Sequence, residues 1–205
     1  MIFTSDKIIR TAFCNILEKE LQNYRNESQH PAEIFEELGV RHGTARIDIA
    51  VVNGIMHGYE IKSDKDTLQR LPEQMKEYND VFDKITLIVG KHHLFDAINT
   101  IPEWWGITVA KINTNEEVVF NTIREADNNP GQKGISVARL LWREEALQIL
   151  KKQNKAKGIK SKSRELIYER LANTLDINKL KDQVRHTLLV SRDWRSDSLL
   201  LQHGD

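Results

Sequence analysis

The chain has 205 residues, with 30 Lys and Arg against 30 Asp and Glu, so its formal net charge is zero and its pI is about 7.1. These totals exclude a globally basic nucleic-acid binder and an acidic tail protein, and the 40% hydrophobic content is typical of a globular protein. The single cysteine, Cys14, excludes an internal disulfide framework and a cysteine-based zinc site. A lone cysteine fits a reducing compartment, and we expect a cytoplasmic protein.

No stretch of the chain is long and apolar enough to predict a membrane span or a signal peptide, because charges at Asp6, Lys7 and Arg10 interrupt the N-terminal segment. The zero net charge conceals an asymmetry. Residues 1–120 hold 13 basic and 19 acidic side chains, whereas residues 121–205 hold 17 and 11. An acidic first part suits metal ions and a basic second part suits phosphates.

The first half of the chain predicts two helices followed by a hairpin. Residues 5–24 carry apolar side chains at three- and four-residue spacing, and Pro31 is expected to begin a shorter helix that Gly39 ends. The period then changes to two in residues 46–52 and 57–63, which we predict as strands joined at Asn53-Gly54.

Further elements follow in alternation. Residues 67–81 predict a helix with Pro72 in its first turn, residues 85–89 a buried strand, residues 94–101 a helix and residues 107–112 a strand. The breaker-rich segment Asp127–Gly131 is the best domain boundary. Beyond it, apolar positions predict three helices, over residues 137–150, 166–175 and 177–189. We therefore expect an α/β core at residues 1–125 and an all-helical basic module at residues 130–205.

Two predicted strands carry the residues best suited to catalysis. Asp48 lies on the first strand of the hairpin, and Glu60 and Lys62 lie on one face of the second strand. Carboxylate oxygens suit Mg²⁺, and a nearby lysine can orient a metal-bound water for attack on a phosphodiester. The alternative is a solvated strand face on which these charges only pair with their neighbours.

These residues resemble the PD-(D/E)XK nuclease superfamily, in which an Asp precedes an acid-x-Lys on the next strand. Gln74 and Tyr78 resemble the QxxxY motif of one exonuclease-rich branch, and a spacing of four places them on one helical face. Ile47, and not proline, precedes Asp48, which departs from the superfamily name. The resemblance implies a restriction-endonuclease-like core, a central mixed sheet flanked by helices.

A narrower resemblance covers most of the chain. The stretch from Arg46 to Gly90, the WWG of residues 104–106 and the LLWREEAL of residues 140–147 are similar to a bacterial family of this superfamily whose activity is not established. This likeness supports the nuclease interpretation and gives no substrate.

The superfamily pattern assigns an expected role to each matching residue. Asp48, Glu60 and the Ile61 carbonyl would ligate Mg²⁺ or Mn²⁺, and Lys62 would position the attacking water. Members commonly add an acid from the first core helix, which would hold a second metal or its waters. Glu37 is preferred for this role over the other two candidates, Glu33 and Glu36.

The motif helix supplies the remaining expected contacts. Gln74 and Tyr78 would steady Lys62 or a phosphate oxygen. Arg70 would contact the phosphate next to the scissile bond, and its alternative is a surface salt bridge with Glu73 or Asp66.

A lysine-rich run lies between the first two predicted helices of the module. It holds seven basic residues and no acid over residues 151–164, and it can neutralise phosphates without reading sequence. Its alternative is a solvated loop. The residues expected to contact nucleic acid are Lys152, Lys155, Lys157, Lys160, Lys162 and Arg164.

Two other pairs of residues have simpler interpretations. Asp64 and Asp66 are expected to cap the next helix rather than extend a metal site. Trp104 and Trp105 are expected to pack against the core rather than stack on bases.

The expected function is Mg²⁺- or Mn²⁺-dependent hydrolysis of phosphodiester bonds in DNA, in repair, mobile-element maintenance or phage defence. The alternatives are a catalytically inactive nucleic-acid-binding or adaptor protein with the nuclease fold, and a nuclease subunit that requires a partner helicase or ATPase. The chain has no P-loop motif of its own. A homodimer also stays open, as do single- or double-stranded substrates, internal or end-directed cutting, and RNA.

Overall fold

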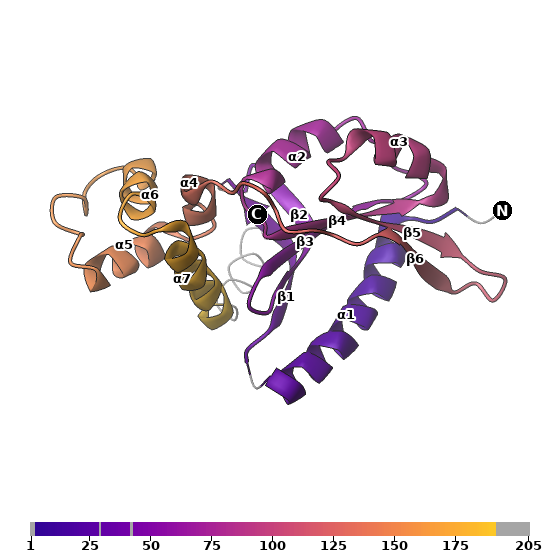
Figure 1. Cartoon of the computed structure of the whole chain (residues 1–205), viewed down its shortest axis with the longest axis horizontal. Helices are drawn as coiled ribbons and strands as arrows, with labels where there is room; N and C mark the ends of the chain where they lie inside the picture. The colour runs from indigo at the N-terminus through magenta and orange to yellow at the C-terminus, as the bar shows by residue number, and fades with distance from the viewer. Residues whose placement is uncertain (1–2, 29, 42, 192–205) are drawn as a thin grey trace, which may run out of the picture. The chain divides into compact units, whose positions relative to one another are not determined.

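The computed structural model describes residues 3–28, 30–41 and 43–191 and divides the chain into two compact units, residues 1–132 and 133–205 (Figure 1). The breaker-rich segment Asp127–Gly131 lies directly before this division. The boundary expected from turn-forming residues therefore agrees with the boundary between the two units.

A six-stranded mixed sheet forms the centre of the first unit, with its strands in chain order. The strands are β1 (Glu33–Val40), β2 (Ala45–Val52), β3 (Met56–Lys62), β4 (Lys84–Gly90), β5 (Gly106–Ile112) and β6 (Val118–Arg124). The pairs β1–β2, β2–β3 and β5–β6 are antiparallel, whereas β3, β4 and β5 run parallel to one another.

Helices flank this sheet, which confirms the predicted α/β class. The long helix α1 (Asp6–Ser28) lies on one side, and α2 (Leu71–Asn79) and α3 (Leu94–Thr100) lie on the other (Figure 1). A 3₁₀ turn, η1 (Lys91–His93), directly precedes α3. Pro72 lies in the first turn of α2, as expected.

The apolar stripe of α1 explains its position. Ile9, Leu17 and Leu21 are buried in one cluster with Ile49 of β2 and Ile61 of β3. These contacts remove the apolar stripe from water and leave the polar side of the helix exposed. The helix is thereby fixed across the strands that carry Asp48 and Glu60.

The predicted helix at residues 32–38 is wrong, because this segment forms β1. Ile34, Leu38 and Val40 are buried and pair with β2 in antiparallel register. Apolar residues four positions apart satisfy both a helical and a two-residue period, so this short segment is ambiguous in sequence. Pairing with β2 decides for the strand.

Two further findings concern the sheet and its packing. Strand β6 was not expected, although four of the seven residues in its sequence VVFNTIR are β-branched. Trp105 is fully buried, and its indole Nε1 donates to Asn79 Oδ1 at 2.8 Å. The packing interpretation is therefore confirmed for Trp105.

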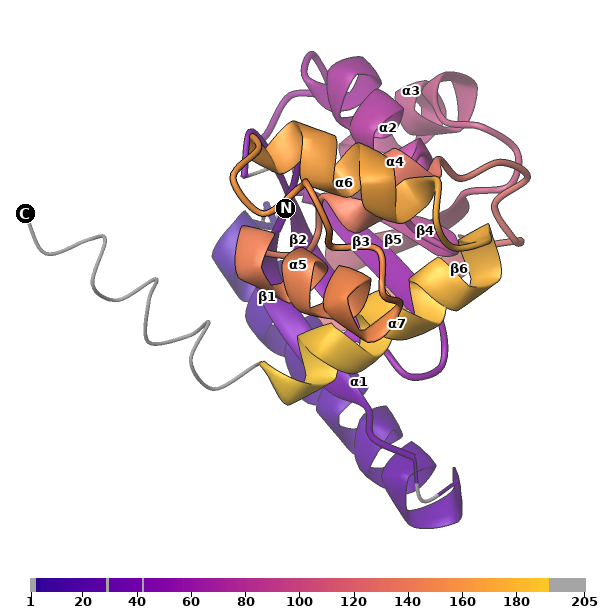
Figure 2. The same ribbon diagram turned by 90° about the vertical axis from the view of Figure 1, so that its left-hand side faces the viewer.

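The described part of the second unit contains four helices: α4 (Gly134–Ala138), α5 (Arg143–Lys152), α6 (Arg164–Ala172) and α7 (Ile177–Val190) (Figure 2). The single helix expected over residues 137–150 is divided into α4 and α5. The Trp142 N–H donates to Glu145 Oε2, which caps α5, and the Tyr168 hydroxyl donates to the Leu141 carbonyl. These tertiary and capping bonds replace the backbone bonds of a continuous helix.

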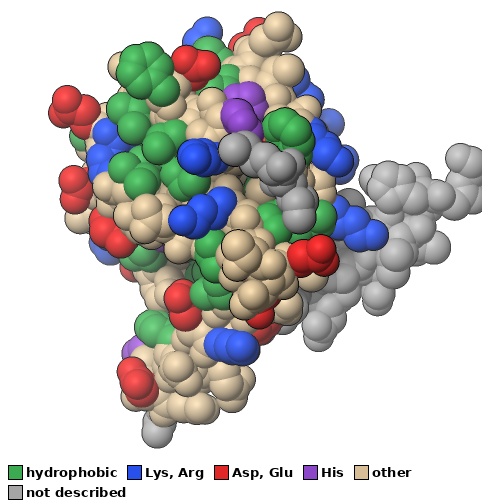
Figure 3. Space-filling model, turned by 90° about the vertical axis from the view of Figure 1, so that its right-hand side faces the viewer, with side chains coloured by type: hydrophobic (Ala, Val, Ile, Leu, Met, Phe, Trp, Pro, Cys, Tyr) green, Lys and Arg blue, Asp and Glu red, His purple; other side chains and the backbone are tan. Residues whose placement is uncertain are grey.

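The exposed surface is mixed in character. In the face drawn in Figure 3, apolar side chains lie among charged ones. The large apolar residues left exposed in the first unit include Phe95 and Ile98 of α3 and Ile123 of β6. Within the described residues, the structure contains no helix with the length and apolar character needed to cross a membrane.

Close packing at the end of β4 gives a testable prediction. A Cβ added at Gly90 would lie 2.5 Å from the Asp64 backbone nitrogen, whereas one added at Gly131 would meet nothing within 4 Å. We expect Gly90→Ala to lower the free energy of unfolding by about 1–3 kcal/mol through overpacking. Urea denaturation measures this loss. Gly131→Ala is the matched control and should change stability by less than about 0.5 kcal/mol; equal effects of the two changes would contradict the prediction.

Candidate active site

The sheet opens where the two predicted catalytic strands carry their carboxylates. Pairing of β2 with β3 ends at Ile49 and Tyr59, and Asp48 and Glu60 are the next residues in that register. Asp48 Oδ2 accepts a hydrogen bond from the Ile61 N–H at 2.6 Å, so a side chain replaces the missing backbone partner. The structure thus brings Asp48, Glu60 and Ile61 together, as the sequence predicted.

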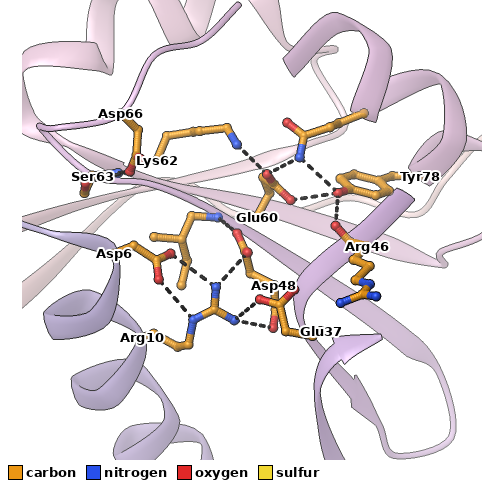
Figure 4. Close-up of polar contacts among 12 residues, drawn as sticks. Asp6, Arg10, Glu37, Arg46, Asp48, Glu60, Lys62, Ser63, Asp66 and Tyr78 are labelled. Carbon is orange, nitrogen blue, oxygen red and sulfur yellow. Dashed lines mark hydrogen bonds and ion pairs between the residues drawn. The ribbon is translucent and has the colours of Figure 1, made fainter. Parts of the chain in front are cut away.

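Glu60 lies at the centre of a polar network in which only 1% of its side chain is exposed (Figure 4). Its Oε1 accepts from Lys62 Nζ and from Gln74 Nε2, each at 2.6 Å. Its Oε2 lies 2.9 Å from the Tyr78 hydroxyl. Gln74 and Tyr78 therefore reach Glu60 itself, where the expected contact was Lys62 or a phosphate oxygen.

The pKa values of both carboxyls are raised above their ordinary range. Burial raises the pKa of Glu60 to about 7, and the negative charge of Asp48 adds to this effect. Burial also raises the pKa of Asp48, although the Ile61 N–H and the Arg10 guanidinium oppose the shift. Burial thus disfavours the charged form of both carboxyls.

The Tyr78 hydroxyl contacts both the Glu60 carboxylate and the backbone of β2. The Tyr78 hydroxyl lies close to both the Arg46 carbonyl and Glu60 Oε2. Burial and the charge of Glu60 raise the pKa of Tyr78 above its usual range, so the phenol keeps its proton. A hydroxyl donates only one proton. The Arg46 carbonyl and Glu60 Oε2 therefore share the single proton of the Tyr78 hydroxyl.

Arg10 of α1 holds the second half of the site. Its Nη2 donates to Asp48 Oδ1 at 2.8 Å, and its Nη1 lies 2.8 Å from Glu37 Oε1. Asp6, one turn earlier on the helix, accepts from Nε and Nη2 at 3.2 Å each (Figure 4). Sequence reasoning missed Arg10 and Asp6. Their i,i+4 spacing was visible, but such pairs are common on helix surfaces.

The predicted helix acid lies on a strand. Glu37 belongs to β1, next to Asp48 in the β1–β2 register, and its φ of 51° lies in the left-handed region. This conformation is uncommon for a residue with a side chain, and such strain concentrates at functional sites. Of the other two candidates, Glu33 pairs with Arg25, and Glu36 lines a separate cavity.

A cavity of about 770 Å³ surrounds these groups. Arg70 lines it, and within the described residues no ion pair joins Arg70 to Glu73 or Asp66. Arg46 and Lys76 also line the cavity and are exposed. These three cations add positive charge around the carboxylates. Only Arg70 was named from the sequence.

The expected metal ligands fit a divalent cation in chemistry. Asp48, Glu60 and the Ile61 carbonyl supply oxygen atoms, which Mg²⁺ prefers. In this conformation each carboxylate oxygen already has a hydrogen-bond partner within the protein. A cation would therefore have to compete with these N–H and O–H donors for the carboxylate oxygens. Across the described ranges, no group of three or more His, Cys, Asp or Glu side chains is placed to hold a metal.

Neighbouring acids have structural roles that differ from the capping expectation. Asp64 accepts from the Thr4 N–H and hydroxyl and from His92 Nδ1, and Asp66 accepts from the Ser63 N–H and hydroxyl. Helix α2 begins later, at Leu71, without a side-chain cap. The capping prediction is wrong because the chain between β3 and α2 is longer than expected.

The lysine-rich run of the second unit extends from the end of α5 to the start of α6. All seven of its basic side chains are exposed. The Arg143 guanidinium donates to the Lys160 carbonyl. This bond holds the backbone between α5 and α6 and does not involve the Lys160 ammonium, which can still contact a phosphate.

The charge of Asp48 gives a prediction about Glu60. Asp48→Asn removes a negative charge beside Glu60, so the pKa of Glu60 should fall from about 7 toward its ordinary value. Titration of the side-chain ¹³C carboxyl resonance of Glu60 measures the shift. Glu73→Gln, which removes a charge elsewhere in the cavity wall, is the control and should leave the pKa of Glu60 unchanged. An unaltered pKa in Asp48→Asn would refute the coupling.

Comparison with known proteins links the chain to phage proteins. The family model of bacteriophage P4 protein cII matches residues 6–204. Protein cII of Enterobacteria phage P4 is 29% identical over 102 residues, which are 50% of this chain and 38% of that protein. The match thus spans less than two fifths of that relative's length. None of these names states a reaction.

A solved structure is also similar over part of the chain. It is the SPO1766 protein of unknown function from Silicibacter pomeroyi, at 15% identity and a TM-score of 0.37. The similarity covers 62% of this chain and 83% of that chain.

Proposed function

The chain belongs to the bacteriophage P4 protein cII family, and we propose that it is a divalent-metal-dependent nuclease that hydrolyses phosphodiester bonds in DNA. One observation carries the proposal: Asp48, buried Glu60 and Lys62 converge where β2 and β3 separate. Like-charged carboxylates are held together there against electrostatic repulsion, an arrangement that a bound cation stabilises.

The arrangement of elements supports a restriction-endonuclease-like core of the PD-(D/E)XK type as part of this proposal. Helix α1 precedes three strands linked as hairpins, and α2 and β4 follow. These elements agree with a central mixed sheet flanked by helices, which the sequence resemblance implied. The acid expected from a core helix departs from that resemblance, since Glu37 lies on β1.

In the proposed reaction, Asp48, Glu60 and the Ile61 carbonyl would hold Mg²⁺ or Mn²⁺, and Glu37 lies beside Asp48. A metal bound there would supply Lewis acidity for the hydrolysis. Lys62 donates one of its three N–H groups to Glu60, so the ammonium can also orient water or a phosphate oxygen. Gln74 and Tyr78 hold the Glu60 carboxylate in place.

Positive charge on both units suits a polyanionic substrate. In the first unit, Arg46, Arg70 and Lys76 line the cavity around the carboxylates. In the second unit, the lysine-rich run exposes seven basic side chains. Such contacts bind phosphates without reading the base sequence, so they support nucleic acid and leave strandedness and cutting mode open.

A specific observation also favours an inactive nucleic-acid-binding or adaptor protein. Every carboxylate oxygen of Asp48 and Glu60 has a hydrogen-bond partner in the protein itself, so these four oxygens are satisfied without a metal. A nuclease subunit that acts with a partner ATPase, and a homodimer with two sites, are further forms of the main proposal.

Cleavage of DNA tests the catalytic proposal. Glu60→Gln and Lys62→Met should each reduce Mg²⁺- or Mn²⁺-dependent cleavage by about 100-fold or more, because they remove a metal ligand and a charge that stabilises the phosphate. Initial rates on linear, circular, branched and single-stranded DNA measure the loss and identify the substrate form.

Lys65→Met is the control, because Lys65 is exposed and follows the same strand outside the network. Its rate should equal that of the wild type. If the wild type and all three variants show the same low rate yet bind DNA, the binding protein replaces the nuclease as the better explanation.

The lysine-rich run gives a separate prediction on affinity. Changing Lys155, Lys157, Lys160 and Lys162 together to Gln should weaken DNA binding and reduce the slope of log K against log salt by about 0.9 for each phosphate that the variant no longer neutralises. Fluorescence anisotropy over a salt series measures both quantities. A double change of exposed Lys19 and Lys111 to Gln is the control in the first unit. An unchanged slope in the quadruple variant would show that the run does not contact DNA.

A further inference from the structure

All three nitrogens of the Arg10 guanidinium are engaged within the candidate site. Nε donates to Asp6, and Nη2 donates to Asp6 and Asp48 Oδ1. Nη1 donates to the Asp48 carbonyl at 2.9 Å and forms an ion pair with Glu37 at 2.8 Å. An arginine has five such donors in a fixed planar fork. Only 17% of its side chain is exposed. Arg10 is thus a nearly buried cation that bridges α1, β1 and β2.

This cation shares its partners with the proposed metal. Asp48 Oδ2 is bound by the Ile61 N–H, so Oδ1 is the oxygen less constrained by the strand, and Arg10 holds it. Glu37, which the superfamily pattern assigns to a second metal or its waters, forms an ion pair with the same guanidinium. A divalent cation beside Asp48 would therefore lie next to a positive guanidinium, and like charges at such a distance repel.

The charges of the side chains around Arg10 also support competition between Arg10 and a metal. Asp6, Glu37, Asp48 and Glu60 carry four negative charges when ionised, and Arg10 and Lys62 carry two positive ones. The difference of two negative charges has the same magnitude as the charge of one divalent cation. Arg10 thus neutralises part of the cluster in the metal-free chain, which lets the carboxylates remain close together.

The surroundings of Arg10 leave room for it to move. A second cavity of about 300 Å³ lies along α1, and Arg10 and Asp6 both line it. Asp6 also lines the main cavity. Because Asp6 contacts Nε and Nη2, it can retain the guanidinium when Asp48 is released.

We infer that Arg10 is an internal counter-ion that competes with the divalent metal for Asp48 and so sets the metal concentration at which the site is occupied. The inference rests on the proposed function, because it concerns the metal site named there. Arg10 is a positioning residue: it holds Asp48 in the metal-free chain and leaves Asp48 Oδ1 when metal binds.

Calorimetric titration of the full chain with MnCl₂ tests the inference. Arg10→Gln removes the competing charge and should bind Mn²⁺ at least tenfold more tightly than the wild type. Arg10→Lys keeps the charge and should bind within about threefold of the wild type. Arg25→Gln is the matched control, because Arg25 lies on α1 with ion pairs to Glu18 and Glu33 outside the site, and its affinity should be unchanged.

The outcomes separate the inference from the proposed function. Mn²⁺ binding in the wild type that Glu60→Gln abolishes and Arg10→Gln leaves equal or weaker would overturn the inference alone. Absence of Mn²⁺ binding in the wild type and in Arg10→Gln would overturn both.

A second measurement uses the wild type and does not depend on the folding of a variant. The Nε–Hε resonance of Arg10 in a ¹H–¹⁵N spectrum reports on its contact with the cluster. Adding MgCl₂ should shift this resonance, while that of Arg25 stays in place. An Arg10 resonance that remains unchanged while calorimetry shows Mg²⁺ binding would refute the displacement.

Discussion

The repulsion between two carboxylates, buried Glu60 and partly buried Asp48, is the constraint on which the candidate site depends. Asp48 and Glu60 lie together where the sheet opens. Burial raises the pKa of both, and the charge of Asp48 raises that of Glu60 further. Ionised groups in such a place need opposite charges or hydrogen-bond donors. Arg10, Lys62 and Tyr78 supply them in the structure, and a divalent cation would do so in the proposed reaction. The same repulsion therefore explains both the observed network and the chemistry proposed for it.

The fold produces this constraint by supporting the site from both faces of the sheet. Helix α1 carries Arg10 to Asp48, and α2 on the opposite side carries Gln74 and Tyr78 to Glu60. Because β2 and β3 no longer pair at this point, both helices can reach the carboxylates between them.

The chain, a member of the protein cII family, consists of two units that carry different charge. The carboxylates lie in the α/β unit, and the exposed lysine-rich run lies in the helical unit. Catalysis and non-specific phosphate binding would therefore depend on different residues and can be altered separately. The chain matches 38% of the length of the phage P4 relative, so the properties of that whole protein are not transferred to this one.

Sequence alone determined the elements whose pattern has one physical solution. Period-two segments with a turn gave the hairpin that carries Asp48 and Glu60, and a spacing of four gave the face shared by Gln74 and Tyr78. Tertiary structure decided what depends on distant partners. Pairing with β2 made residues 33–40 a strand and placed Glu37 beside Asp48, and packing of α1 across the sheet brought Arg10 to the same carboxylate. Local spacing records which side chains share a face, whereas contacts between elements far apart in sequence are fixed only when the core packs.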